Sequence, residues 1–249
     1  MNAQRFTDVL TRKYRTFRRD PLGSTGHRLR MLCDWCYVPL RYCDEQWDAH
    51  RLRRRGYVDF LASRPPHAIP PNYSDLWFLY ETVRRRRPRC ILEFGSGCST
   101  VILTQALWEI QRESPSAHRR LFAVETDPYW AEVTVASLPP HLRALCDIQC
   151  SRLLEVEYEG TPALRHADVP DVVPDFVYLD GPPLTPERQV ASDVLELEDR
   201  FPKEFCMVVD GRWKNLRFFR QHCRRRYRFK EVGLSLNHHL NQHVVELWE

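Results

Sequence analysis

The chain of 249 residues lacks any long hydrophobic run, and this absence limits where the protein is expected to work. No apolar stretch approaches the ~18 residues that a membrane-spanning helix requires. Residues 1–19 also lack the apolar core of a secretory signal peptide. We therefore expect a cytoplasmic protein.

The sequence shows no sign of a disulfide framework, although it contains nine cysteines. Disulfide-rich domains are typically short and secreted. This chain has 249 residues, and residues 1–19 do not have the pattern of a signal peptide. Cys33, Cys36 and Cys43, with His50 beyond them, are residue types that bind zinc. Their spacing does not match a familiar zinc-finger pattern, so we assign no metal to them and leave their role open.

Lysine is scarce, with four among 37 basic residues, so nearly all positive charge comes from arginine. Residues 1–60 carry 13 basic and 7 acidic residues, a net charge of +6 against +4 for the whole chain. The basic runs at 51–55, 84–87 and 224–226 lack the interleaved aromatics of a nucleic-acid stacking surface. Nucleic acid is therefore not expected as a partner. The arginine-rich leader fits a solvated helical extension best, with contact to an anionic membrane surface as the alternative.

Proline marks the one clear boundary of the chain. Residues 1–20 and 28–62 have helical spacing of their apolar residues, and residues 64–71 form a proline-rich connector. A helix then opens at Ser74 or Asp75. We predict a basic helical extension over residues 1–72, placed as a lid over the ligand face, and one α/β domain over residues 73–249.

The most informative stretch lies at 90–100, where a short apolar strand, a glycine loop and a helix start follow one another. Gly95 and Gly97 permit a sharp turn and a close approach of a ligand to the backbone. Ser99 and Thr100 are suited to capping the helix, whose free N–H groups attract an anionic group. Glu93 ends the strand, where a buried carboxylate needs a partner: a loop N–H or the ammonium of a bound ligand.

Three further predicted strands carry an acid at or near their carboxyl ends. They end at Glu125, Asp180 and Asp210, and helical segments separate them. Ligands of open α/β sheets bind outside the carboxyl ends of the strands, so these acids are expected to share one site. Glu125 is placed to accept hydrogen bonds from ribose hydroxyls, and Asp127 is suited to cap the helix that begins at Pro128.

These segments, 92–97, 124–125, 178–182 and 208–211, resemble the class I S-adenosylmethionine-dependent methyltransferases over residues 73–249. The resemblance implies a doubly wound, seven-stranded, mostly parallel sheet with an antiparallel last strand, which residues 227–232 and 243–248 would complete. The chain differs from the family pattern at Thr100, where many relatives have a third glycine. It also differs at Ser151 and Arg152, where relatives often have an acid that contacts adenine. The residues assigned to S-adenosylmethionine are Glu93, Gly95, Ser96, Gly97, Ser99, Thr100, Glu125, Asp127, Ser151 and Asp180.

Methyl transfer requires aligned reactants and, for poor nucleophiles, removal of a proton. Asp180 and Asp210 are the predicted catalytic residues. Asp180 would act as a base, or both acids would hold Mg²⁺ as in catechol-type enzymes. Those enzymes usually have an acid-Asn pair where this chain has Asp210-Gly211, so metal is not favoured. Arg188 and Arg212 are assigned to the substrate.

The sequence thus predicts an O- or N-methyltransferase acting on a small-molecule or glycan-type acceptor. Two alternatives stay open: a non-catalytic binding protein on the same scaffold, and a nicotinamide-dependent oxidoreductase. Glu125 follows Gly95 by 30 residues, whereas ~20 is usual in dinucleotide fingerprints, which argues against the oxidoreductase. The methyl acceptor and the oligomeric state are not readable from the sequence.

Overall fold

The computed structural model of the chain describes residues 43–183, 190–231 and 242–248. Most of the predicted basic extension, including Cys33 and Cys36, lies outside the described residues, and so does Arg188. Residues 43–54 are helical. None of the helices in the described part of the chain is both long enough and apolar enough to span a bilayer.

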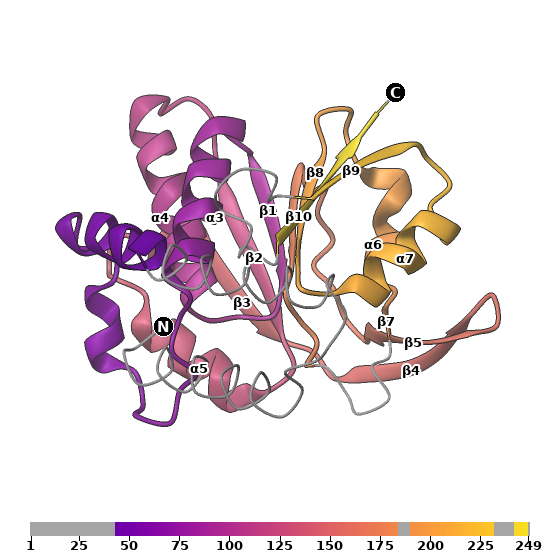
Figure 1. Ribbon diagram of the computed structural model, residues 1–249, viewed down its shortest axis with the longest axis horizontal. Coiled ribbons are helices and arrows are strands. Elements are labelled where there is room, and N and C mark those ends of the chain that lie inside the picture. The colour runs from indigo at the N-terminus through magenta and orange to yellow at the C-terminus, as the bar shows by residue number, and fades with distance from the viewer. Residues whose placement is uncertain (1–42, 184–189, 232–241, 249) are drawn as a thin grey trace, which may run out of the picture.

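Short helices and strands alternate along the described chain (Figure 1). In order, they are η1 (Asp59–Ser63), α3 (Tyr73–Arg86), β1 (Cys90–Phe94), α4 (Cys98–Glu113), β2 (Arg120–Glu125), α5 (Pro128–Ser137), η2 (Arg143–Leu145), β3 (Cys146–Cys150), β4 (Leu153–Tyr158), β5 (Thr161–His166), β6 (Phe176–Leu179), β7 (Val190–Ala191), α6 (Asp193–Leu197), η3 (Glu198–Arg200), β8 (Cys206–Asp210), α7 (Trp213–His222), β9 (Tyr227–Glu231) and β10 (Gln242–Leu247).

Seven strands form the central sheet in the order β3-β2-β1-β6-β8-β10-β9. The first five are parallel, and β10 runs antiparallel to both β8 and β9. The chain builds outward from β1 to β3 and then returns to β6 on the other side of β1. Loops leave β1 and β6 toward opposite faces at such a switch point, which opens a crevice between them. The predicted seven-stranded, mostly parallel sheet is confirmed.

Two apolar cores cover the two faces of the sheet. On one face, Ile91 of β1 packs with α3 and α4 in a cluster that also includes Leu52 and Phe60. On the other face, Leu92 and Phe94 pack with α6, α7 and the segment around β5. Figure 1 shows α3, α4 and α5 on one side of the sheet and α6 and α7 on the other. Because both faces are covered, the central parallel strands β1, β6 and β8 are almost continuously apolar.

Helix α3 begins earlier than the sequence predicted. Asn72 is its N-cap, and its side chain accepts hydrogen bonds from the backbone N–H groups of Ser74 and Asp75, at 3.1 and 3.4 Å. The prediction of a start at Ser74 or Asp75 was therefore wrong by one or two residues. At the other end, Arg87 adopts a left-handed conformation with φ of 54° and terminates the helix.

A second, three-stranded sheet has the order β4-β5-β7. Strands β4 and β5 lie in the crossover between β3 and β6, where no strand was predicted, and β7 follows β6. Strands β4 and β5 form a hairpin around Glu159 and Gly160, whose φ angles are both positive, 48° and 79°. Two positive φ values are those of a type I′ hairpin turn. Strand β7 runs parallel to β5 and extends the hairpin beside α6 and α7 (Figure 1).

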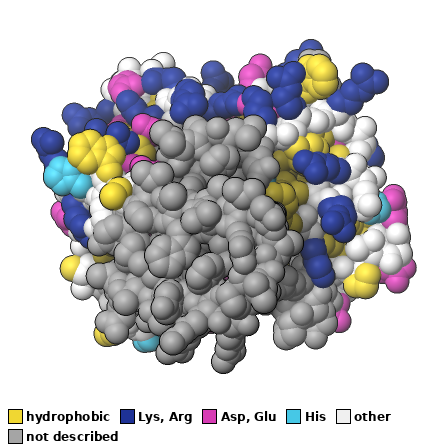
Figure 2. All heavy atoms as spheres, viewed as in Figure 1, with side chains coloured by type: hydrophobic (Ala, Val, Ile, Leu, Met, Phe, Trp, Pro, Cys, Tyr) yellow, Lys and Arg dark blue, Asp and Glu magenta, His cyan; other side chains and the backbone are white. Residues whose placement is uncertain are grey.

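Several arginines of the described basic runs form ion pairs on the surface. Arg84 and Arg87 of the 84–87 run both contact Glu113, at 2.5 and 2.7 Å. Arg224 contacts Asp199 at 2.9 Å. Figure 2 shows basic side chains along the upper rim of the molecule with acidic ones among them. These arginines therefore belong to solvated, paired faces in the described part of the chain.

Candidate active site

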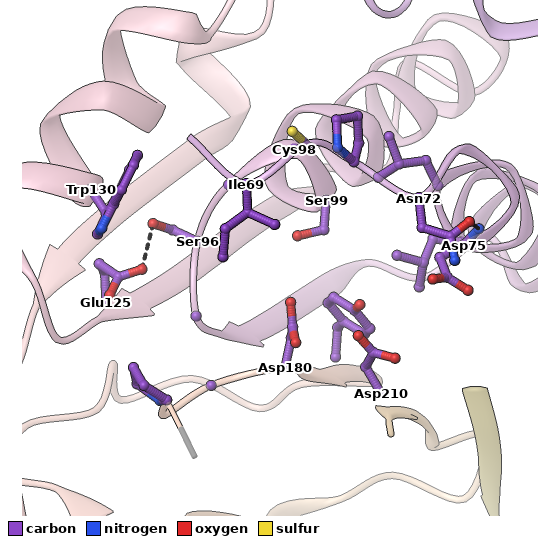
Figure 3. A pocket seen from close by; sticks show the side chains of 18 of the residues that line it. Ile69, Asn72, Asp75, Ser96, Cys98, Ser99, Glu125, Trp130, Asp180 and Asp210 are labelled. Atoms are coloured by element: carbon purple, nitrogen blue, oxygen red, sulfur yellow. Dashed lines mark hydrogen bonds between the residues drawn. The ribbon is translucent and has the colours of Figure 1, made fainter. Parts of the chain in front are cut away.

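A cavity of about 720 Å³ lies above the carboxyl ends of β1, β2, β6 and β8 (Figure 3). Its walls come from the glycine loop, the starts of α3 and α4, and the loop after β6. The proline-rich connector contributes Arg64, Ile69, Pro70 and Pro71. A segment that the sequence marked as a boundary therefore forms one side of the site.

The base of the cavity depends on the close approach of two glycines. Gly95 has a φ of 102°, and a Cβ at Gly181 would lie 2.7 Å from the backbone nitrogen of Gly95. The Asp180 and Gly181 N–H groups both donate to the carbonyl oxygen of Phe94. Glycine is required at both positions because the loops after β1 and β6 touch through their backbones.

Glu93 is fully buried behind the glycine loop and does not line the cavity. The Ser99 hydroxyl, which does line the cavity, donates to Glu93 Oε1 at 2.5 Å. Burial raises the pKa of Glu93 from its ordinary 4.5 to about 8, and the hydrogen bonds from Ser99 and Thr100 oppose this shift. The Oε2 atom has no hydrogen-bond partner within the described residues.

Ser99 and Thr100, the two predicted caps of α4, have different hydrogen-bond partners. The Thr100 hydroxyl oxygen accepts from the backbone N–H of Gly97 at 2.9 Å, so Thr100 does cap the helix. Ser99 is committed to Glu93 instead, so its expected capping role was wrong.

Glu125 stands at one end of the cavity, with Ser96 and Trp130 beside it (Figure 3). Its Oε2 accepts from the Ser96 hydroxyl at 2.8 Å, and its Oε1 accepts from the backbone N–H groups of Thr126 and Asp127 at 2.7 and 3.1 Å. These bonds fix the carboxylate at the strand end. Its remaining lone pairs can accept hydrogen bonds from a ligand.

Besides Glu93 and Thr100, two further residues assigned to the cofactor, Asp127 and Ser151, lie outside the cavity lining. Asp127 caps α5 by accepting from the Tyr129 N–H at 2.9 Å, as the sequence predicted. The Ser151 hydroxyl is buried and accepts from the Asp168 N–H at 2.9 Å. Contact of either residue with a ligand stays a prediction.

Asp180 and Asp210 meet in the middle of the cavity, with Asp75 of α3 on the side of Asp210 (Figure 3). Asp180 is exposed to the open space of the cavity, and Asp210 is half-buried. Burial raises the pKa of each carboxyl, and the charge of Asp180 raises that of Asp210 further. Two neighbouring acids with raised pKa values are an arrangement that suits proton transfer.

Arg212 does not line the cavity. Its buried guanidinium donates to the carbonyl oxygens of Asp180 and Pro182 and so holds the loop that carries Asp180. Burial lowers the pKa of Arg212, and the charges of Asp180 and Asp210 oppose that shift. Its assignment to the substrate stays a prediction, as does that of Arg188 outside the described residues.

Sequence reasoning missed a buried histidine in the cavity wall. His166 ends β5 and contacts Asp193 at the start of α6. The two residues are distant in sequence, so no local motif joins them, although the Glu159-Gly160 turn between alternating segments indicates the hairpin that carries His166. Cys98, also in the wall, accepts from Arg64 at 2.6 Å. Among the described residues, no group of three His, Cys, Asp or Glu side chains is placed to hold a metal ion.

No protein-family model matches the chain, and no curated protein matches its sequence. Solved structures with a similar arrangement include an O-methyltransferase of Streptomyces achromogenes involved in tomaymycin synthesis, in complex with S-adenosylmethionine. It is 16% identical with a TM-score of 0.47, over 82% of this chain and 88% of that chain. An O-methyltransferase of Bacillus cereus, in complex with S-adenosylhomocysteine, is 13% identical with a TM-score of 0.44, over 85% and 91%.

A Podospora anserina methyltransferase bound to S-adenosylhomocysteine is 10% identical with a TM-score of 0.44, over 92% of this chain and 98% of that chain. Structural similarity at these TM-scores carries no information about the reaction of this chain. The fold rests instead on the strand order, the antiparallel β10 between β8 and β9, and the crevice between β1 and β6. By these features the chain has the Rossmann-like fold of the class I S-adenosylmethionine-dependent methyltransferases.

Proposed function

We propose that the protein transfers a methyl group from S-adenosylmethionine to an oxygen or nitrogen atom of a small-molecule or glycan-type acceptor. The observation that supports this most is the cavity, in which Glu125 lies at one end and the Asp180–Asp210 pair in the middle. One end thus offers a hydrogen-bond partner for a ribose, and the middle offers a carboxyl group that can take up a proton.

The residues present fit the cofactor. The cavity volume of about 720 Å³ falls within the roughly 300–1,000 Å³ of small-molecule sites. Glu125 offers carboxylate oxygens to ribose hydroxyls, Trp130 offers an apolar face beside it, and α4 begins at the cavity, where its dipole favours a carboxylate. When bound, the cofactor would supply a methyl group on a sulfonium.

The acceptor would enter where Asp75, Asp180 and Asp210 converge. Asp180 faces the cavity beside Asp210, and its ionised carboxylate would take a proton from the acceptor. Arg212 keeps Asp180 in place by holding the loop backbone. Mg²⁺ held by Asp180 and Asp210 is the alternative, and turnover in the presence of a chelator distinguishes the two mechanisms.

Calorimetric titration with S-adenosylhomocysteine and with NADH tests the proposal. Only the first ligand should bind; binding of NADH alone would support the oxidoreductase. Glu125→Ala should weaken S-adenosylhomocysteine about 10- to 100-fold, because hydrogen bonds to a charged partner are lost. Glu132→Ala, on the exposed face of α5, is the control and should leave the affinity unchanged. Unchanged affinity of Glu125→Ala would reject the ribose assignment.

A further inference from the structure

The outermost strand of the sheet, β9, presents cations on one face and aromatic rings on the other. Tyr227 and Phe229 pack against the core on the side of α6 and α7. Side chains alternate between the two faces along a strand, so Arg226, Arg228 and Lys230 lie on the α3 side. All three of these basic residues are exposed.

The neighbouring strand β10 supports this assignment, because directly paired residues share a face of a sheet. Val244 packs against the core on the α3 side and lies opposite Lys230 in the ladder. Glu246 lies opposite Arg228. Arg86, in the last turn of α3, forms an ion pair with Glu246. The end of α3 and the outermost strand therefore meet around one carboxylate.

Positive charge on this face exceeds what that carboxylate can balance. Arg86 and Lys230 both pair with Glu246. Arg226 and Arg228 form no ion pair within the described part of the chain. Exposed cations without acidic partners repel one another, so an anionic partner would relieve this repulsion.

An exposed tryptophan adjoins these cations. Trp248 is 62% exposed, and its backbone N–H donates to the Arg226 carbonyl oxygen at 2.8 Å. The Arg228 guanidinium lies 4.8 Å from the centroid of its ring. A hollow of about 530 Å³ beside the ring is lined by Arg224, Arg225, Arg226 and Trp248. Figure 2 shows basic side chains gathered at the upper right of the molecule, where Figure 1 places the end of β10.

We propose that the β9 basic face, formed by Arg86, Arg226, Arg228, Lys230 and Trp248, docks the protein on a membrane that contains anionic phospholipids. Clustered basic side chains are attracted to the negative potential of such a membrane. A tryptophan ring is amphipathic and favours the level of the lipid headgroups. The arginine-lined hollow suits the phosphate of one headgroup. The proposal is independent of the proposed methyl transfer.

Nucleic acid is the other polyanion to consider, and the placement of the rings argues against it. Single strands bind where bases stack on aromatic side chains within a basic groove. Tyr227 and Phe229, which alternate with the arginines in sequence, pack into the core on the opposite face. Among the described residues of the β9 basic face, Trp248 is the one aromatic ring.

Docking through this face would leave the cavity free. Strand β10 runs antiparallel to β8, with Gln242 opposite Asp210 and Glu246 opposite Cys206. Asp210 lines the cavity, whereas Glu246 lies among the docking cations. The two sites therefore lie at opposite ends of β10.

Flotation of the full-length protein with phospholipid vesicles tests the proposal. Wild type should float with phosphatidylcholine vesicles that contain about 30% phosphatidylserine and stay behind with pure phosphatidylcholine. Combining Arg226→Gln with Arg228→Gln should lower the partition coefficient about 25-fold, since each arginine near an anionic surface contributes about fivefold. Salt at about 0.5 M should weaken wild-type flotation by screening the same charges. Trp248→Ala should also weaken flotation, through loss of the interfacial ring.

Combining Arg54→Gln with Arg217→Gln gives the matched control. This variant loses the same charge from exposed positions elsewhere, in the helix at 43–54 and in α7 on the other side of the sheet. Its partition coefficient should stay within about twofold of wild type. Urea midpoints equal to that of wild type would show that the substitutions change binding and not folding.

Absence of wild-type flotation with the anionic vesicles would overturn the proposal, and so would equal flotation with the neutral ones. Unchanged flotation of the Arg226→Gln, Arg228→Gln variant would assign membrane binding to another surface, such as the arginine-rich leader, and would also overturn it. Binding of a single-stranded oligonucleotide in place of vesicles, lost in that variant, would make nucleic acid the partner instead.

Discussion

Replacing Glu93 by glutamine should make the stability of the protein less sensitive to alkaline pH. The side chain is 0% exposed, and its pKa is raised from 4.5 to about 8 by burial, against the hydrogen bonds from Ser99 and Thr100. The folded state thus holds the Glu93 proton to a higher pH than the unfolded chain does. Stability from this group is present below about pH 4.5 and is lost as the pH rises through about 8.

The size of the effect follows from the two pKa values. Relative to a protonated group, the penalty on the folded state is about 1 kcal/mol at about pH 5 and about 5 kcal/mol at about pH 9. Glutamine does not titrate, and its Oε1 can still accept from Ser99. The advantage of Glu93→Gln over wild type should therefore grow by about 4 kcal/mol between these two pH values.

Urea denaturation of both proteins at about pH 5, 7 and 9 measures this difference, and all other titrating groups cancel because both proteins share them. Glu113→Gln is the control. Glu113 lies on the surface of α4, where Arg84 and Arg87 lower its pKa, so it is ionised throughout this range. Its difference from wild type should stay constant. A constant difference for Glu93→Gln as well would show that Glu93 is charged in the folded protein.

Two further substitutions test the cavity: Gly181→Ala tests its backbone packing, and Asp210→Asn tests its protonation. Gly181→Ala should destabilise the protein by about 1–3 kcal/mol, since its Cβ would lie 2.7 Å from the Gly95 nitrogen; an unchanged urea midpoint would mean that the loops can separate. Wild-type kcat/KM should rise with pH in the alkaline range as Asp210, whose pKa is raised by burial and by Asp180, loses its proton. Asp210→Asn cannot ionise and should flatten that rise; a rise that persists would assign it to another group.

The strands were the most predictable part of the fold. The segments at 90–94, 121–125 and 205–210 are apolar runs with an acid at or next to their last residue, and they lie close to β1, β2 and β8 as observed. Buried parallel strands are nearly continuous in hydrophobicity, so they stand out in sequence. Residues 153–166 were harder to read. Their alternation of apolar and polar side chains fits a half-exposed hairpin, which the expectation of alternating strands and helices did not include.

The candidate site was predictable where the chain returns repeatedly to one edge of the sheet. Glu125, Asp180 and Asp210 line the same cavity because parallel strands end together. Pairings between distant segments could not be read in the same way. The contact of Arg212 with the Asp180 carbonyl, and that of His166 with Asp193, depend on how loops meet above the sheet.

The strand nearest the end of the described chain, β10, occupies an interior place in the sheet. It lies between β8 and β9, so these two strands have no direct ladder with each other. During synthesis, β8 would therefore keep an open edge until residues 242–247 leave the ribosome. The apolar surface at the open edge of β8 must therefore be protected until β10 pairs with it.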